Sequence, residues 1–413
     1  MSGTLLAINN YHYRRGGADA IFLDQMEMFA RSGWNAVPFS MQHPDNLPSQ
    51  WSPYFVPEIE FGRQGGLMTK IGHGLEIIYS RKARQSLAAL IDQVRPDVAH
   101  AHNVYHHISP AIFPLLKKKG IPTVMTVHDL KLACPSYKML APDGVCERCK
   151  GGRIYNVLLH RCMKGSIALS GLVMVETAVH RALRLYRDHI DKLVVPSRFY
   201  RQKLIEWGWP DDKLVYIPNF VDHAISEQRF AVEEGDYFLF AGRLAPEKGV
   251  DTLIRAAARS GQRLRVAGTG PEEAELRALA QIENADVEFL GYLSGQALHE
   301  TVAGAKALVL PSEWYENAPV SILEAYALGR PVIGTDIGGI PELIKPGETG
   351  LIAAPGDPDD LAGALNAMNQ FSASERKEMG ERGRAWVNQE FSRGAFFERT
   401  LDLYRGLGIS SLG

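Results

Sequence analysis

The chain has 413 residues, of which 46% are hydrophobic and 22% are charged, a composition typical of a globular protein rather than a disordered or fibrous one. Its 45 basic and 47 acidic residues give a formal net charge of −2, which argues against a nucleic-acid-binding protein. Single cores usually stop growing at about 250–300 residues, so this length predicts two domains. The sequence shows no signal-peptide pattern and no apolar run approaching the roughly 18–20 residues of a membrane span, so we expect a cytoplasmic protein.

Charge is distributed unevenly along the chain. Residues 1–195 hold 23 basic and 15 acidic residues, a net charge of +8, together with 11 of the 13 histidines. The remaining residues hold 22 basic and 32 acidic ones, a net charge of −10. The sequence therefore predicts two chemically different halves.

The first half alternates short apolar runs with longer amphipathic stretches. Between the first two runs, Phe22, Met26 and Phe29 recur at i, i+4 and i+7, which predicts a helix over Ala18–Arg31 with one buried face. The apolar runs are typical of buried parallel strands: Thr4–Ile8, Asn35–Phe39, Asp97–His100, Thr123–Val127 and Lys192–Val195.

Polar and glycine residues follow two of these predicted strands. Gly16 and Gly17 lie between the first strand and the first helix, where glycines let a ligand approach the backbone closely; a plain turn is the alternative. His128 and Asp129 directly follow the strand that begins at Thr123. Open α/β sheets bind ligands at the carboxyl ends of their strands, so His128 is a candidate catalytic residue, with a structural histidine as the alternative.

All four cysteines lie in one window that is rich in turn residues. Cys146 and Cys149 form a CxxC core, with Cys134 twelve residues before it and Cys162 thirteen residues after it. Four thiolates suit a closed, tetrahedral structural zinc site. Two disulfides are disfavoured in a reducing compartment, and an iron–sulfur cluster or a redox pair is the alternative.

The basic character of the first half suggests contact with an anionic membrane surface. A helical stripe of Leu67, Ile71, Leu75 and Ile78 lies beside some of the basic residues and could enter such a surface. A core-facing helix with solvated charges is the alternative interpretation. The basic residues concerned are Arg63, Lys70, Arg81, Lys82, Arg84, Lys117, Lys118 and Lys119.

A domain boundary is expected near Pro218–Gly235, which is polar and acidic before a second series of alternating elements begins. Strands are predicted at Tyr237–Ala241, Arg263–Ala267, Val287–Leu290, Ala307–Leu310 and Pro331–Gly334. Helices are predicted at Val250–Ser260, Glu272–Ile282 and Val320–Leu328, and a final amphipathic helix carries Phe397, Leu401 and Tyr404. The alternation predicts an α/β fold with two doubly wound, Rossmann-like domains facing each other.

The run FAGRLAPEKG at 240–249 is the most informative in the second half. Arg243 and Lys248 flank the start of the helix predicted at Val250, where free N–H groups and the helix dipole favour an anion. Two cations at that point suit a diphosphate, whereas the alternative is a solvated loop.

Glu316 and Glu324 are eight residues apart, one in a loop and the other on the helix that follows. Pro319 is expected at the first helical position. Both carboxylates are predicted to face one cleft, where they could bind sugar hydroxyls or act in acid–base chemistry. Ordinary helix-terminal carboxylates are the alternative.

Two further motifs fail closer inspection. AGTGPEEA at 267–274 has Glu273 in place of the third glycine of a nicotinamide-binding fingerprint. DPD at 357–359 resembles a metal-binding pair but precedes a helical pattern, which favours a helix cap.

Together these motifs resemble glycosyltransferase family 4, whose members have the two-domain GT-B fold and transfer sugar from a nucleotide donor with retention of configuration. The resemblance runs from about residue 4 to the final helix. It rests on Gly16-Gly17, TVHD at 126–129, PNFVD at 218–222, GRLAPEKG at 242–249, GxG at 268–270, FLGY at 289–292, Glu316 and Glu324.

The resemblance implies domains at 1–217 on the acceptor side, with a Cys-rich insert at 134–162, and at 218–392 on the donor side, and a helix at 393–413 that crosses back to the first domain. It implies His128, Glu316, Arg243 and Lys248 as catalytic residues. Arg243, Lys248 and Gly17, next to Gly16, would hold the diphosphate, Glu324 the ribose, and the backbone at Leu290–Tyr292 the base. Glu316 with the backbone N–H groups near Asn317, Ala318 and Val320 would hold the donor sugar.

The expected partners are a UDP- or GDP-sugar and a saccharide or lipid-linked acceptor, but no nucleic acid. Because the two cations and a helix N-terminus can stabilise the departing diphosphate, no catalytic metal is expected. Peripheral contact with the inner face of a membrane is a hypothesis. The alternatives are another GT-B enzyme, such as a phosphorylase or a sugar-nucleotide epimerase, and a non-catalytic sugar-nucleotide binder.

Overall fold

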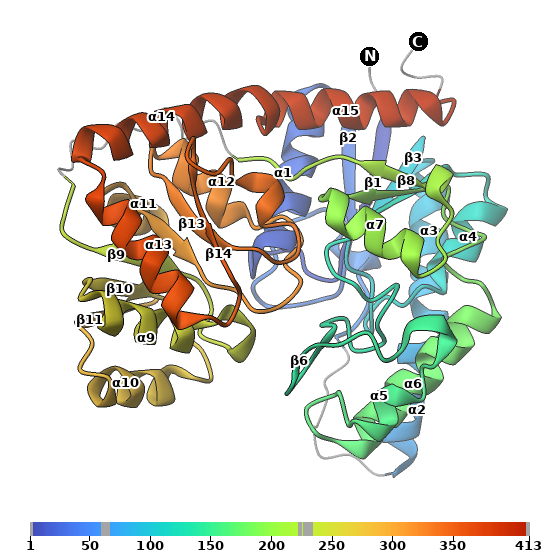
Figure 1. The fold of residues 1–413 in the computed structure, drawn as a ribbon. Helices are drawn as coiled ribbons and strands as arrows, with labels where there is room; N and C mark the ends of the chain where they lie inside the picture. The colour runs from blue at the N-terminus through green and yellow to red at the C-terminus, as the bar shows by residue number, and fades with distance from the viewer. Residues whose placement is uncertain (1–2, 59–66, 222–224, 226–233, 410–413) are drawn as a thin grey trace.

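The computed structural model describes residues 3–58, 67–221, 225 and 234–409. They form two α/β domains, each with a six-stranded parallel sheet between layers of helices (Figure 1). The predicted fold class, two doubly wound Rossmann-like domains, is confirmed. No helix within the described residues is long and apolar enough to cross a bilayer.

The first sheet has the strand order β2-β1-β3-β4-β7-β8, and all of its pairings are parallel. Its middle strands are apolar because helices cover both faces. The sequence missed only the last strand, which has three residues. The strands are β1 (Thr4–Ile8), β2 (Asn35–Phe39), β3 (Val98–Ala101), β4 (Thr123–Thr126), β7 (Lys192–Val195) and β8 (Leu214–Tyr216). The helices are α1 (Gly17–Arg31), α2 (Leu67–Ile78), α3 (Arg81–Val94), α4 (Ile112–Lys118), α5 (Asn156–Leu159), α6 (Ile167–Ala182) and α7 (Arg198–Glu206).

The cysteine-rich insert lies between β4 and α6 and contains little regular structure. It holds a short antiparallel hairpin, β5 (Leu140–Ala141) and β6 (Gly144–Val145), and a 3₁₀ turn at Lys150–Gly152. Figure 1 shows the hairpin projecting toward the second domain.

The second sheet has the order β11-β10-β9-β12-β13-β14 and is also parallel. Its strand order reverses between β9 and β12, the point at which doubly wound sheets bind ligands. The strands are β9 (Phe238–Ala241), β10 (Leu264–Ala267), β11 (Val287–Gly291), β12 (Leu308–Leu310), β13 (Val332–Thr335) and β14 (Gly350–Ala353). The helices are α9 (Val250–Ser260), α10 (Glu273–Ile282), α11 (Gly295–Ala303), α12 (Val320–Ala327), α13 (Pro358–Gln370) and α14 (Ala373–Glu390).

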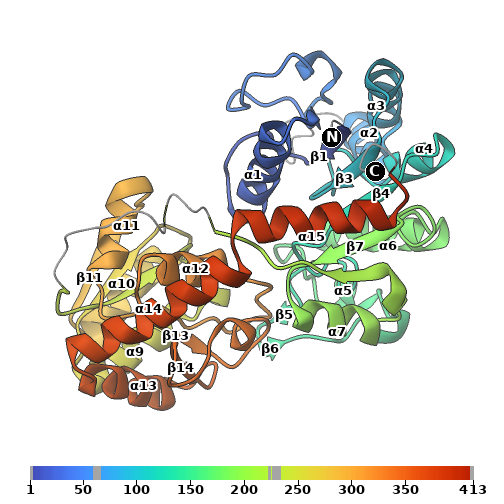
Figure 2. The same ribbon diagram turned by 90° about the horizontal axis from the view of Figure 1, so that it is seen from above.

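The chain passes between the domains twice, and the two passages touch at a bridge between Val221 and Ser392. After the second passage, α15 (Arg393–Gly406) lies across the first domain beside α1 (Figures 1 and 2). Leu401 and Tyr404 are buried in the core of that domain, as expected for the inner face of the predicted amphipathic helix.

Two local predictions differ from the structure. Pro319 caps α12 from outside instead of occupying its first helical position, because its ψ of 115° is extended. In α2, Leu75 is 63% exposed and Ile77 is buried, so the apolar stripe does not form one core-facing row. Arg63 and the side chains of Leu67, Lys70 and Ile71 lie outside the described residues.

Asp357 accepts hydrogen bonds from two N–H groups of α13, which confirms the helix-cap interpretation of DPD.

Candidate active site

A charged cluster lies at the carboxyl ends of β9 and β12, where the second sheet reverses its order. Lys248, in the loop before α9, places its Nζ 2.6 Å from Oε1 of Glu316. Ser312 donates a second hydrogen bond to the same oxygen over 2.8 Å. Burial alone would raise the pKa of Glu316, but Lys248 and the hydrogen bonds lower the pKa by more than burial raises it. The pKa therefore lies below its usual range, and the buried carboxylate stays ionised. The structure therefore joins two residues that the sequence assigned separately to diphosphate and sugar.

Arg243 is exposed at the start of the same loop, facing the first domain. Burial raises the pKa of Tyr137 in the insert, as do Asp129 and Glu247, and the positive charges of Arg243 and Arg15 oppose the rise. Tyr137 thus lies near charges from both domains.

The N-terminus of α1 opens at the end of β1. Gly16 is the N-cap residue and has an extended backbone, with φ −164° and ψ −178°. A Cβ atom added to Gly16 or Gly17 would meet no protein atom within 4 Å. The space beside both glycines is open, so a ligand can reach the free N–H groups of a 15-residue helix.

His128 is the end of a chain of buried polar side chains that runs through the first domain. His100 and His102, both on β3 or its end, are stacked with ring centroids 5.0 Å apart, and His102 is stacked on His128 at 5.1 Å. Gln25 of α1 contacts both β3 histidines, and Tyr404 of α15 contacts His100 over 2.6 Å. We call these five residues the histidine ladder. It connects the end of β4 to the helix that returns from the second domain.

The hydrogen bonds of the ladder assign the tautomer of each ring. The amide nitrogen of Gln25 can only donate, so His100 accepts at Nδ1, while the amide oxygen can only accept, so His102 donates from Nε2 over 2.9 Å. His102 then accepts at Nδ1 from Nε2–H of His128 over 2.8 Å. Burial lowers the pKa of His128 to about 4. His128 is therefore neutral at pH 7 and keeps Nδ1 as a hydrogen-bond acceptor.

Asn317 joins the two domains through its side chain. Its Nδ2 donates to the carbonyl of Val127 over 2.9 Å and to that of His128 over 3.3 Å, and its Oδ1 accepts from Ser197 over 2.9 Å. Gly338 lies against the same loop, where a Cβ atom would come within 2.4 Å of the carbonyl oxygen of Glu316. The amide side chain of Asn317 is thus engaged by the first domain.

The remaining predicted donor residues surround this loop without forming one cluster. Burial raises the pKa of Glu324 on α12 to about 7. Ala318 is buried, and Val320 begins α12. At the end of β11, Leu290 is half-buried and Tyr292 is 74% exposed.

The four cysteines of the insert are free thiols that line one cavity of about 10 Å³, together with Trp207. Burial raises the pKa of Cys149 to about 12, and the three other cysteines contribute to the rise. Across the described parts of the chain, no group of three or more His, Cys, Asp or Glu side chains is arranged as a ready metal site.

The insert also contacts the second domain. Lys138 lies 3.4 Å from Glu247, and Tyr315 donates to Glu147 over 3.1 Å. These contacts, the side-chain hydrogen bonds of Asn317 to the first domain and the inner histidines were not predicted. The only available signal was the i, i+2 spacing of His100 and His102 on one strand, which places both on the same face.

Comparisons with known proteins cover nearly the whole chain. Residues 15–225 match the family model described as "Glycosyltransferase Family 4", and residues 222–386 match "Glycosyl transferases group 1". A GDP-mannose-dependent alpha-mannosyltransferase of Mycobacterium tuberculosis is 30% identical over 68% of this chain and 78% of its own length. An alpha-D-kanosaminyltransferase of Streptomyces kanamyceticus is 29% identical over 44% of this chain. The match spans less than half of that relative, 48%.

Solved structures share the fold. Sucrose-phosphate synthase from Thermosynechococcus elongatus superposes with a TM-score of 0.72 at 20% identity, over 98% of this chain and 99% of that one. Anabaena HepE in complex with UDP and glucose superposes with a TM-score of 0.67 at 15% identity, over 98% of this chain and 100% of that one.

Proposed function

This chain belongs to glycosyltransferase family 4, and on that premise we propose that it transfers a sugar from a UDP- or GDP-sugar to a saccharide or lipid-linked saccharide acceptor. The printed names of its relatives include GDP-mannose-dependent enzymes, and one structural neighbour is a complex with UDP and glucose. The observation that carries the proposal is the ion pair of Lys248 and Glu316, with the exposed Arg243 in the same loop as Lys248.

Arg243 and Lys248 would act on the leaving group. Breaking the bond between sugar and phosphate develops negative charge on the diphosphate. Fixed cations and helix N–H groups stabilise that charge more strongly as it grows, and a single such donor contributes about 100–1,000-fold to turnover in other enzymes. Because protein groups supply this stabilisation, we propose that transfer needs no catalytic metal. Turnover that persists in excess EDTA supports this, and turnover restored only by Mg²⁺ or Mn²⁺ contradicts it.

Glu316 and His128 would recognise the sugar itself. The ionised carboxylate of Glu316 accepts hydrogen bonds, and the neutral ring of His128 offers Nδ1 as an acceptor from the opposite domain. Sugar hydroxyls donate to both. We propose that the new bond retains the configuration of the donor, either by attack on the same face or through a covalent intermediate. The anomeric proton coupling of the product, measured by NMR, tests this.

The insert would bind a structural zinc ion through Cys134, Cys146, Cys149 and Cys162. Supporting this proposal, all four thiols line one cavity whose volume of about 10 Å³ is close to that of a single small occupant. The surrounding chain has little regular structure to hold it in place, and binding would draw the sulfur atoms together. Elemental analysis should find one zinc per chain, and Cys149→Ser should lose it. Iron in place of zinc indicates the cluster alternative, and no metal contradicts the proposal.

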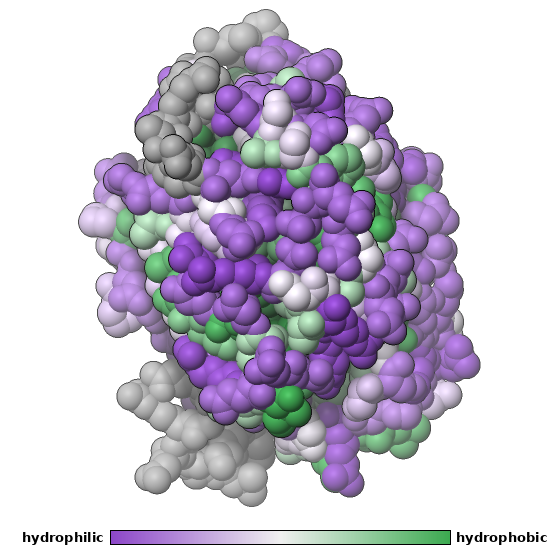
Figure 3. All heavy atoms as spheres, turned by 60° about the vertical axis from the view of Figure 1, so that its left-hand side comes forward, coloured by the Kyte–Doolittle hydropathy of each residue, from purple (hydrophilic) through white to green (hydrophobic). Residues whose placement is uncertain are grey.

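The first domain would also contact an anionic membrane surface. Large apolar side chains, each exposed by 52–67%, lie on α2, α5 and α6 or next to their ends, and these helices lie side by side in Figure 1: Leu75, Tyr155, Leu159, Ile167 and Leu183. Exposed Arg153, Arg161 and Lys164 accompany them. The face of the second domain turned forward in Figure 3 is mainly hydrophilic.

Vesicle sedimentation tests the membrane proposal. The protein should sediment with phosphatidylserine vesicles and much less with neutral ones, and Leu159→Ser should weaken binding several-fold. Ile282→Ser, at a residue 79% exposed on the second domain, is the control. Equal binding to both vesicle types contradicts the proposal.

A screen of nucleotide sugars by thermal shift identifies the donor. A ligand at 100 times its Kd stabilises the folded state by about 2.7 kcal/mol, which raises Tm by several degrees. Binding of a UDP- or GDP-sugar followed by transfer to a saccharide is the expected result. Binding without any reaction indicates a non-catalytic binder, and conversion of the donor alone indicates an epimerase.

A further inference from the structure

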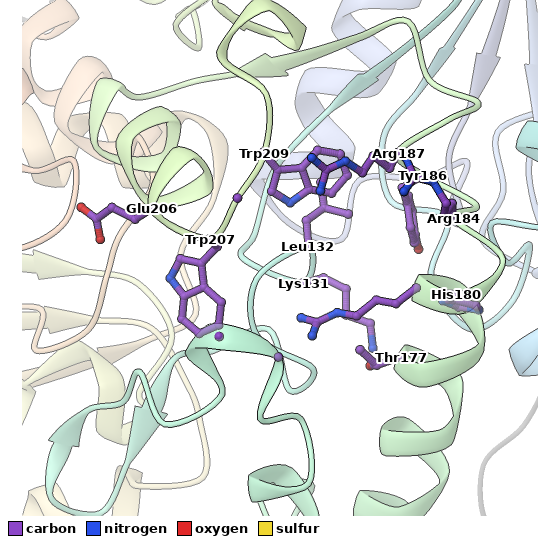
Figure 4. A pocket seen from close by; sticks show the side chains of 14 residues that line it. Lys131, Leu132, Thr177, His180, Arg184, Tyr186, Arg187, Glu206, Trp207 and Trp209 are labelled. Atoms are coloured by element: carbon purple, nitrogen blue, oxygen red, sulfur yellow. The ribbon is translucent and has the colours of Figure 1, made fainter.

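A cavity of about 540 Å³ lies in the first domain beside the insert and apart from the charged cluster. The end of α6 and the loop after it form one wall, the end of α7 a second, and the 3₁₀ turn of the insert a third (Figure 4). It is lined by Lys131, Leu132, Gly151, Gly152, Thr177, His180, Arg181, Arg184, Tyr186, Arg187, Glu206, Trp207, Gly208 and Trp209. Its size is that of a small-molecule site.

The lining is cationic. Lys131 is neutralised by the buried Glu176 over 2.8 Å, and Arg184 pairs with Asp188. Neither Arg187 nor the exposed Arg181 has a carboxylate partner among the described residues, and Arg181 donates to the carbonyl of Ala133 over 3.4 Å.

The single acidic side chain of the lining does not offset this charge. Glu206 pairs with Lys150 and with Lys203, both over 3.2 Å, and Figure 4 shows it directed away from the other lining side chains. The cavity therefore offers guanidinium groups to an anion.

Three buried polar atoms of the lining have no hydrogen-bond partner among the described residues. They are Oγ1 of Thr177, OH of Tyr186 and Nε1 of Trp207. Thr177 is 8% exposed and Tyr186 is 9% exposed. Leaving such a group unpaired costs about 1–3 kcal/mol, and protein covers all three atoms in this conformation, so a polar ligand in the cavity completes their hydrogen bonds only if their side chains turn toward it.

Aromatic rings supply the remaining surface. Trp207 and Trp209 stand on one side of the cavity and Tyr186 on the other (Figure 4). A pyranose ring has an apolar C–H face that packs on such rings and hydroxyl groups that reach the polar atoms between them. The combination of aromatic faces, unpaired hydroxyl and N–H groups, and arginines suits a sugar that carries a negative charge.

We propose that this cavity binds an anionic saccharide, bearing a carboxylate or a phosphate, as a remote part of the acceptor. The inference rests on the proposed function, since it names the class of acceptor. Lys131 of the lining is three residues after His128, so their Cα atoms are at most about 11 Å apart. An acceptor of a few sugar units held in the cavity can extend toward the histidine ladder, and its binding energy there orients the reacting end.

Calorimetric titration of the full chain without nucleotide sugar tests the proposal. The probes are a glucuronic-acid-containing disaccharide, the neutral disaccharide with the same linkage, and glucose 6-phosphate. We expect at least one charged probe to bind at least tenfold more tightly than the neutral one. A preference for the uronate or for the phosphate identifies the source of the charge. Binding of neither charged probe, or equal binding of all three, overturns the proposal.

Two cavity variants and one control locate the binding. Arg187→Gln should weaken binding of the charged probe at least tenfold. Thr177→Val, which keeps the shape of the side chain, should weaken it about fivefold. Arg201→Gln, which breaks a surface pair with Asp211 outside the cavity, should leave binding unchanged. Binding that is equally tight in all three variants overturns the proposal.

A separate measurement distinguishes this proposal from the proposed function. Arg187→Gln should bind the nucleotide sugar as wild type does and raise the KM for a charged acceptor with kcat retained. If the charged saccharide binds in the cavity but no sugar is ever transferred, the proposed function fails and the cavity proposal stands. If transfer proceeds and no charged saccharide binds, the cavity proposal fails alone.

Discussion

The two domains present different chemistry at the proposed active site. On the second domain, Lys248 and Glu316 form an ionised pair, and Arg243 adds a further cation. On the first domain, the histidine ladder is neutral, because burial lowers the pKa of both His100 and His128, to about 3 and about 4. In the proposed function, the second domain therefore acts on the donor through charge, whereas the first domain acts through oriented hydrogen bonds.

Loss of Lys248 should have the largest effect. Lys248→Ala leaves the buried carboxylate of Glu316 without its cation, so we expect a loss of about 3 kcal/mol in unfolding free energy and at least 100-fold in turnover. Chemical denaturation and donor kinetics measure both. As a control, Lys138→Ala removes the ion pair of the more exposed Lys138 with Glu247 and should change the unfolding free energy by less than about 1 kcal/mol. Equal losses in the two variants contradict the account.

Breaking the ladder should lower turnover without affecting the charged side. Gln25→Leu removes the amide that assigns the tautomers of His100 and His102, so His128 loses its fixed orientation. We expect kcat to fall about tenfold with little change in the KM for the donor. The ¹⁵N chemical shifts of the His128 ring should show mixed tautomers. A single unchanged tautomer together with wild-type kcat contradicts this role.

Donor affinity should depend on pH through Glu324. Its pKa of about 7 lies above that of an exposed carboxyl group, so the folded protein binds a proton more tightly than the unfolded chain does. The carboxyl group therefore favours folding below the unfolded pKa, and that stability is lost as pH rises through about 7. If the ionised form accepts the ribose hydroxyls, binding of an intact nucleotide sugar should tighten several-fold from pH 6 to pH 8. Glu324→Gln should flatten the profile, and an unchanged profile in that variant contradicts the assignment.

The smallest effect is expected where the ladder meets the returning helix. Tyr404→Phe removes one buried hydroxyl that contacts His100 and should cost about 1 kcal/mol in unfolding free energy. The ring packing remains, so donor affinity should not change. A loss of donor affinity would show that α15 is coupled to the charged side and would weaken the distinction between the two sides.

Most of the fold could be predicted from the sequence, because buried parallel strands such as β1 and β9 are short apolar runs between helices. It missed β8 and β14, the last strand at one edge of each sheet, which are short and only partly buried. Individual site residues such as Arg243 and Lys248 were predictable because they lie at a helix N-terminus whose position the sequence reveals.

Contacts between distant segments were not predictable. The pairing of Lys248 with Glu316 joins residues 68 positions apart, and the contact of His100 with Tyr404 joins residues 304 apart. The cavity beside the insert likewise depends on how α6 and α7 pack. Spacing along the chain contains no information on such distances.

The roles proposed for Arg243 and Glu316 can be tested by initial rates of sugar transfer from the donor found in the nucleotide-sugar screen. They should be measured for wild type, Arg243→Ala and Glu316→Gln, with folding checked by circular dichroism. We expect both folded variants to lose at least 100-fold in kcat/KM, since we propose that Arg243 stabilises the leaving diphosphate and that Glu316 binds the sugar. Wild-type rates in both variants would contradict it.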